Sequence, residues 1–313
     1  MQLKPPTSNT EFEALVAPYR GELHAYCYRM LGSLQDAEDA LQEALLGAWK
    51  GLASFEGRSA LRSWLYRIAT NACLRVAEQR PPRMLPADYS RATTGIELDP
   101  IVEAPTWLEP YPTPAGASYE ELESVELAFV AALQYLPATQ RAVLILSEVL
   151  GFSAQELAGL LETSVASINS ALQRARESMA RRAANTSQQA ELRVLGESDQ
   201  RALTSAFVNA WGRSDVPAIV ALLARDARFS MPPIPNWFEG QEAIGRFLAE
   251  RVFQTPWRAI PTRASGQLAF LLYQGPAFAV GALNVLSLRA GEVLEMTGFL
   301  DPAVHARFLP PER

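Results

Sequence analysis

The chain contains 313 residues, of which 49% are hydrophobic and 20% charged, and its formal net charge is −6. This length predicts two or three domains with separate cores, and the acidic balance excludes a protein that coats nucleic acid without selectivity. Without an apolar run of roughly 18 residues or a secretory signal pattern, we expect a cytoplasmic protein that contacts no membrane. Two histidines and two cysteines without Cys/His clustering predict neither a metal site nor a cofactor.

The first part of the chain, residues 11–82, is predicted to be helical. Residues 36–52, DAEDALQEALLGAWKGL, place Leu41, Leu45 and Trp49 four residues apart, which is the spacing of a buried helical stripe. Asp36 is expected to cap this helix, because a carboxylate stabilises the positive N-terminal end.

A second long helix is predicted over residues 61–79, after a short loop around Gly57. It ends before two consecutive prolines, which cannot continue a helix. Cys73 on this helix and Cys27 before it are expected to be small buried side chains. Six arginines and one acid lie between residues 58 and 83, so positive charge is concentrated here rather than spread.

Residues 83–118 are predicted to form a linker that is rich in proline and in acids. Nine acids and one arginine lie between residues 84 and 126. A flexible tether has no need of large apolar side chains, yet TWLEPYP presents Trp107, Leu108 and Tyr111. These three residues indicate either a docked segment or incidental composition.

Residues 119–183 return to helical periodicity and contain a predicted helix-turn-helix. Ser153 and Glu156 have the spacing of a capping box, and Ser164 can cap the following helix. That second helix has one apolar stripe. Its opposite side carries the candidate DNA-reading residues, which are Ala166, Ser167, Ser170, Gln173, Arg174 and Arg181. The alternative is a plain helical hairpin whose arginines lie on a solvated face.

Residues 199–309 are predicted to form an α+β domain. Helices are expected near residues 199–211, 215–224 and 241–251. Strand-like stretches follow near residues 258–264, 268–273, 278–288 and 293–300.

Both helical parts, taken together, resemble an extracytoplasmic-function sigma factor of the sigma-70 family. The resemblance is carried by DAEDALQEALLGAW and SFEGRSALRSWLYRIATN in the first part. In the second part it is carried by LPATQRAVLILSEVLGFSAQELAGLLETSVASINSALQRARE. It implies core RNA polymerase and promoter DNA, through its −35 and −10 elements, as partners.

The same resemblance implies roles for individual residues. Binding of core polymerase falls on the polar side chains Asp36, Asp39, Gln42 and Glu43. Contacts with the −10 element fall on Phe55, Gly57, Arg58, Ser59, Arg62, Arg67, Asn71 and Arg75, with Arg80 as a further phosphate contact. Phe55 is expected to form one wall for a flipped base, and the Asn71 amide to pair with a base edge. Trp64 is expected in the core, and the helix-turn-helix would contact the −35 element.

Residues 199–309 resemble a SnoaL-like domain of the nuclear-transport-factor-2-like superfamily. The similar stretches are ALTSAFVNAWGRSDVPAIVALLARDARFSMPPIPNWFEGQEAIGRFL and GFLDPAVHARFLP. This implies an α+β cone that regulates the sigma domains in cis, by intramolecular contact with them or with the linker. Asp226, Glu239, Asp301 and His305 are the candidates for acid-base chemistry, but we predict no catalytic residue and no enzyme.

Two other functions stay open at this point. One is a polymerase-independent helix-turn-helix regulator that senses a ligand in its C-terminal pocket, and the other is an enzyme with a helical adaptor. The segment 36–80 argues against both, because neither needs a clamp-binding helix followed by a base-flipping loop.

Overall fold

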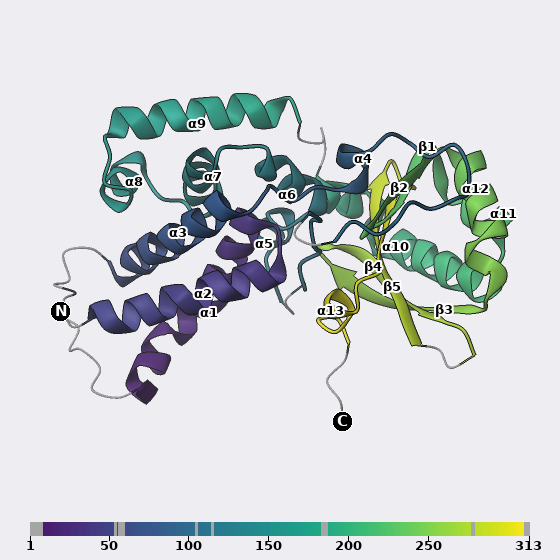
Figure 1. Cartoon of the computed structure of the whole chain (residues 1–313), viewed down its shortest axis with the longest axis horizontal. Helices are drawn as coiled ribbons and strands as arrows, with labels where there is room; N and C mark the ends of the chain where they lie inside the picture. The colour runs from purple at the N-terminus through teal and green to yellow at the C-terminus, as the bar shows by residue number, and fades with distance from the viewer. Residues whose placement is uncertain are drawn as a thin grey trace. The chain divides into compact units, whose positions relative to one another are not determined.

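The chain divides into two compact units in a computed structural model, which describes residues 9–52, 55, 60–103, 106–113, 116–182, 187–276 and 279–309. The first unit comprises residues 1–83 and 128–183, and the second comprises residues 84–127 and 184–313 (Figure 1). The segment 84–127 therefore leaves one unit, belongs to the other, and returns.

The first unit is helical. Its three N-terminal helices are α1 (Asn9–Leu31), α2 (Leu34–Gly51) and α3 (Leu61–Gln79). The later helices are α6 (Leu127–Gln134), α7 (Ala138–Leu144), a π-helical turn (Ile145–Val149), α8 (Ala154–Leu160) and α9 (Val165–Ala180). The bounds of α3 are those predicted from the sequence.

Helix α2 differs from the prediction in its cap and in one core position. Ser33 is the N-cap, and its side chain accepts a hydrogen bond from the Asp36 amide, so the expected cap at Asp36 is wrong. Leu41 and Leu45 are buried, but Trp49 is 40% exposed and meets Phe12 edge-on with ring centroids 5.2 Å apart. Trp49 lies in the last turn of α2, where the neighbouring helices cover the apolar stripe only in part.

The helix-turn-helix is built as its capping residues predict. Ser153 and Glu156 form a reciprocal capping box at the start of α8, and Ser164 accepts from the Ser167 amide at the start of α9. On α9, the buried stripe is Ile168, Ala171, Leu172, Ala175 and Met179.

The second unit is an α+β domain around one six-stranded sheet with the order β2-β1-β6-β5-β4-β3. The strands are β1 (Leu223–Met231), β2 (Ile234–Glu239), β3 (Trp257–Ala264), β4 (Gln267–Gln274), β5 (Ala279–Arg289) and β6 (Glu292–Phe299). Neighbours are antiparallel except β1 and β6, which are parallel. The four C-terminal strands were predicted, whereas β1 and β2 were not.

Helices cover this sheet. They are α4 (Pro86–Tyr89), α5 (Tyr119–Glu123), α10 (Gln188–Gly212), α11 (Val216–Val220), α12 (Gln241–Glu250) and α13 (Pro302–His305). Helix α10 packs on β3, β4 and β5, and α12 packs on β1 and β2. Helix α10 starts eleven residues before the predicted position and is broken at Gly196, whose φ of 72° is non-helical.

Aromatic side chains pack the interior of the second unit. Phe207 stacks on Phe270 with centroids 4.2 Å apart, and Phe238 stacks on Phe247 at 4.1 Å. Trp211 meets the rings of Phe253 and Trp257 edge-on. These contacts place the rings in the interior of the second unit.

The segment after α3 is bound to one edge of this sheet. We call residues 84–113 the linker strap. The Thr93 amide donates to Trp237 O at 2.7 Å, and the Val102 amide donates to Pro233 O at 3.1 Å. Because β2 is an edge strand, these bonds satisfy backbone groups that no other strand reaches.

The C-terminal end of the linker strap reaches the opposite edge, β3. Ser265 N donates to Tyr111 O at 2.7 Å, and Tyr111 N donates to Ser265 Oγ at 3.0 Å. Pro112 forms an antiparallel bridge with Ala264, the last residue of β3. The linker strap is thus part of the second unit rather than a free tether.

A buried carboxylate, Glu126, fixes the end of the segment 84–127 on the second unit. Glu126 is 3% exposed and accepts from the amides of Gln188 and Gln189, at the start of α10, at 2.9 and 2.7 Å. Burial raises the pKa of Glu126 to about 7, although both amide donors act in the opposite direction. The residue before α6 is therefore anchored to the second unit.

Candidate nucleic-acid interface

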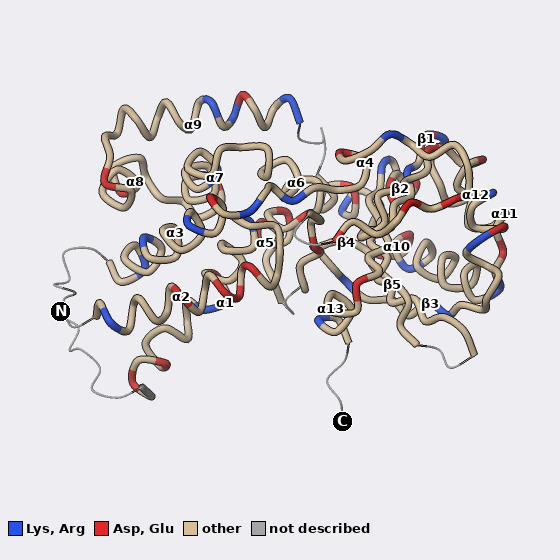
Figure 2. The backbone as a smooth tube through the Cα atoms, in the orientation of Figure 1, with Lys and Arg blue, Asp and Glu red and all other residues tan. Residues whose placement is uncertain are grey.

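Helix α9 presents the predicted reading face to solvent. All six candidate residues are exposed, namely Ala166, Ser167, Ser170, Gln173, Arg174 and Arg181. The Gln173 amide donates to Glu177 at 3.1 Å, which holds it along the helix surface. Figure 2 shows the basic residues of α9 in its C-terminal half, so the uncharged N-terminal half is free to approach base edges.

Arginines of the predicted −10 face all meet carboxylates inside the first unit, as far as this face is described. The pairs are Arg62 with Glu22, Arg67 with Glu162, Arg75 with Glu43, and Arg80 with Asp36. Each described arginine of this face therefore has an acidic partner within the first unit.

Two of these arginines face the helix-turn-helix. The Arg62 guanidinium lies 4.7 Å from the centroid of the Phe152 ring, and Arg67 lies 3.5 Å from the Glu162 carboxylate. Tyr66 also meets Phe152 edge-on at 5.4 Å. Glu162, with φ 52°, is in the turn between α8 and α9. Two arginines predicted to contact −10 phosphates, Arg62 and Arg67, thus contact the predicted −35 reader instead.

The predicted base-flipping loop is described only in part. Phe55 lies against Trp64 with ring centroids 5.0 Å apart, and Trp64 is buried. Asn71 is exposed on α3. The remaining loop residues, Gly57, Arg58 and Ser59, fall outside the described residues. A base pocket at this loop stays a prediction.

Helix α2 carries an exposed face of mixed chemistry. Asp39, Gln42 and Glu43 are exposed, and they share this face with Leu46 and Trp49, which are 60% and 40% exposed. Leu46 was not predicted to lie on this face, and Trp49 was predicted to lie in the core. Two large apolar side chains in water beside acids are typical of a protein-binding surface.

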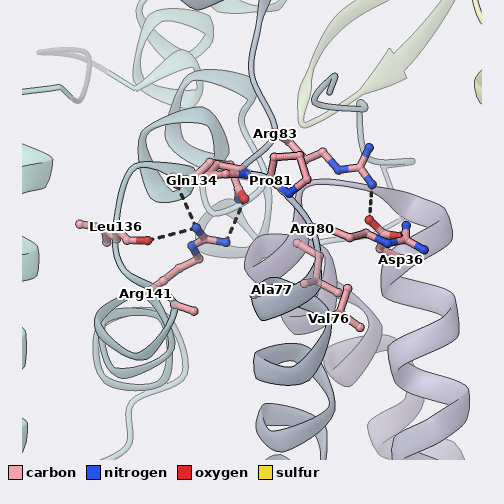
Figure 3. Close-up of a pocket in the computed structure, with 12 residues that line it drawn as sticks. Asp36, Val76, Ala77, Arg80, Pro81, Arg83, Gln134, Leu136 and Arg141 are labelled. Atoms are coloured by element: carbon pink, nitrogen blue, oxygen red, sulfur yellow. Dashed lines mark hydrogen bonds and ion pairs between the residues drawn. The ribbon is translucent and has the colours of Figure 1, made fainter. Parts of the chain in front are cut away.

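Asp36 does not belong to this exposed face. It is 2% exposed, and its carboxylate forms ion pairs with Arg80 and with Arg83, which is also buried (Figure 3). The predicted polymerase contact of Asp36 is at odds with this position, because its carboxylate is used to hold the end of α3 against α2.

A cavity of about 130 Å³ lies beside this cluster and is bordered by Arg141 on the other side. The Arg141 guanidinium donates to five acceptors, which are the carbonyls of Met30, Leu133, Gln134 and Leu136 and the Gln134 side chain. Figure 3 shows its bonds to Gln134 and Leu136. Burial lowers the pKa of Arg141 to about 10. One side chain thereby joins the end of α1 to the α6–α7 turn.

The candidate acid-base residues of the second unit do not form one site, because each has a different structural partner. Asp226 pairs with Arg289, Glu239 lies 3.9 Å from Arg228, and Asp301 caps α13. His305 is buried, with Nε2 2.7 Å from Phe299 O, and burial lowers its pKa.

Within the described ranges, no helix is both long enough and apolar enough to cross a membrane. Groups of three or more His, Cys, Asp or Glu arranged to hold a metal ion are likewise not found among those residues.

Comparison with known proteins assigns the two helical parts of the chain to two regions of one family. Residues 15–80 match the Sigma-70 region 2 model, and residues 126–179 match the Sigma-70 region 4 model. Over 315 residues, the chain is 39% identical to the ECF RNA polymerase sigma factor SigG of Mycobacterium tuberculosis, covering 96% of this chain and 84% of SigG. It is 30% identical over 169 residues to the ECF sigma factor SigW of Bacillus subtilis, covering 54% of this chain and 86% of SigW.

A solved structure shares the whole architecture. The crystal structure of the Mycobacterium tuberculosis extracytoplasmic function sigma factor SigJ covers 96% of this chain and 99% of SigJ, with a TM-score of 0.58 and 20% identity. The predicted fold class is confirmed as far as two helical sigma regions followed by an α+β domain. The chain belongs to the extracytoplasmic-function sigma factors of the sigma-70 family.

Proposed function

We propose that this sigma factor directs core RNA polymerase to its promoters through three surfaces of the first unit. The exposed face of α2 binds core polymerase, α3 and its preceding loop contact the −10 element, and α9 reads the −35 element. The observation that supports this most strongly is α9, a capped helix with one buried stripe and an exposed small-polar face opposite it.

The compact first unit is proposed to be a closed form. About 140 residues in one compact body have a diameter of roughly 40 Å. The −10 and −35 elements lie about 25 base pairs apart, which is roughly 85 Å of duplex. Both readers can engage one promoter only after α3 separates from the helix-turn-helix, which frees Arg62 from the Phe152 ring and Arg67 from Glu162.

The second unit is also proposed to regulate the sigma regions in cis, through the linker strap. The linker strap joins the two sigma regions, and it is held on the second unit by backbone bonds at both edges of the sheet. A strap in this position limits how far the sigma regions can move apart. We infer that binding and release of the linker strap adjust the balance between closed and open forms.

Run-off transcription with core polymerase on a promoter library tests the function. Gln173→Ala is expected to relax preference at one −35 position by about 1–3 kcal/mol, because a base contact is lost. Arg174→Ala is expected to weaken all sequences alike and to reduce the salt dependence. Arg225→Ala, which removes an exposed arginine of the second unit, serves as the control. Unchanged −35 preference and salt dependence in both variants would contradict the assigned reading face.

Transcription by a strap variant tests regulation in cis. Trp107 and Tyr111 are each 7% exposed, so the double variant Trp107→Ala/Tyr111→Ala should release the linker strap. Output from the cognate promoter is expected to change by about fivefold or more at equal protein level, the lower end of ordinary coupling between sites. Ile101→Ala, at a strap residue that is 61% exposed, is the matched control. Equal output from the double variant and the control would refute regulation through the strap.

A further inference from the structure

A second cavity lies wholly within the second unit, where the segment after the linker strap meets α10. Its volume is about 420 Å³, in the range of small-molecule sites. Three parts of the chain far apart in sequence line it: Thr113 with residues between 116 and 122, the first half of α10, and the end of β3 with the turn that follows it. Gly266 lies in that turn, where a Cβ would come within 2.8 Å of the Gln189 amide and 2.9 Å of Leu122 O.

The lining carries two positive charges and no negative one. Arg193 and Arg263 are its charged members, and none of the lining residues is an acid. Neither arginine has a carboxylate within 4.0 Å among the residues that the structure describes. Arg263 is exposed at the cavity, and partial burial lowers its pKa without a carboxylate to oppose that shift.

Both guanidinium groups are held in place but keep donors in reserve. Arg193 lies over the Tyr119 ring at 4.2 Å, and Arg263 donates to the Gln200 side chain at 3.0 Å. Gln200 is itself fixed by donation to Leu192 O at 2.7 Å. A guanidinium has five N–H donors, so most of those on Arg263 are left for a ligand.

One wall of the lining is aromatic and aliphatic, and the remaining members besides the two arginines are Thr113, Gln189, Gln200 and two glycines. Tyr119, Leu122, Leu192 and Ala117 supply the apolar wall. Guanidinium groups recognise carboxylates and phosphates through paired hydrogen bonds, while an apolar wall favours a hydrocarbon body on the same molecule.

We propose that this cavity binds a small organic anion, one with a carboxylate or phosphate group on an apolar body, between Arg193 and Arg263. The ligand would contact α10, β3 and the segment that continues the linker strap. Its binding therefore adds contacts that hold this segment on the second unit. The proposal concerns binding alone and does not depend on promoter recognition.

Calorimetric titration of the full-length chain tests it, with phenyl phosphate, benzoate and inorganic phosphate as probes at constant ionic strength. At least one aromatic probe is expected to bind at one site with a Kd below about 1 mM. Phenyl phosphate alone indicates a phosphate ligand, and benzoate alone a carboxylate ligand. Inorganic phosphate binding as tightly as phenyl phosphate would overturn the apolar part of the proposal.

Two variants locate the site. Arg193→Gln and Arg263→Gln are each expected to weaken binding about tenfold or more, because one ionic partner is lost. Arg258→Gln is the matched control, since Arg258 is exposed on the same strand as Arg263 but does not line the cavity. Absence of binding by both aromatic probes, or equal affinity in all variants, would overturn the proposal. Unchanged circular dichroism shows that the variants fold.

Discussion

Replacement of Arg141 by methionine is expected to lower the free energy of unfolding of the first unit by about 3 kcal/mol or more, because each buried acceptor left without a donor costs about 1–3 kcal/mol. Methionine matches the aliphatic part of the side chain but leaves the five acceptors of Arg141 without their donor. Urea denaturation followed by far-ultraviolet circular dichroism, which reports mainly on the helical unit, measures the loss.

Two further variants interpret this result. Arg176→Met removes an exposed pair with Glu148 and is expected to cost at most about 1 kcal/mol. Arg141→Lys keeps a charge and three donors, so its loss should lie between the other two. An Arg141→Met variant as stable as Arg176→Met would show that water from the adjoining cavity replaces the guanidinium.

The second large effect is expected at the exposed face of α2. Leu46→Arg should weaken binding to core polymerase by about 30-fold, the equivalent of an interface hot spot of roughly 2 kcal/mol. Leu46 is 60% exposed, so its replacement is expected to leave the fold intact. Surface-immobilised core enzyme and the full-length sigma factor give the affinity.

The control for this experiment is Val194→Arg, which places the same charge at an apolar residue of the second unit that is 86% exposed. Asp39→Arg should act in the same direction as Leu46→Arg, because it inverts a charge on the same face. Wild-type affinity in both α2 variants would remove this face from the polymerase interface.

Helices and their caps could be predicted because each leaves a local pattern. The bounds of α3, the capping box at Ser153 and the cap at Ser164 follow from residues within one or two turns. The same locality explains the error at Asp36. An acid at the start of an amphipathic run resembles a cap, and only the distant Arg83 shows that it is a buried ion-pair partner.

The missed strands have a different cause. In β1, LARDARFSM, charged residues interrupt the apolar positions, and the strand pattern is visible only once its partners β2 and β6 are known. The linker strap is harder still, because several of its bonds join backbone groups, which leave no trace in the choice of side chain. Trp107, Leu108 and Tyr111 were the one signal, and all three are buried.

The residues of the candidate site could be predicted from the sequence, but the ion pairs that they form could not. The exposed reading face of α9 follows from helical periodicity alone. The partners Glu22 and Glu162 belong to distant segments, so the neutralised state of α3 could not be derived from spacing.

The position of the linker strap at both sheet borders gives its release a chemical cost. Once it leaves, the carbonyls of Trp237 and Pro233 lose their amide donors, and the end of β3 loses its bridge with Pro112. Bare strand borders are templates for pairing with foreign chains and for aggregation. A molecule that draws the strap away therefore has to protect the borders in its place, either with backbone groups of its own or by bringing another surface over them.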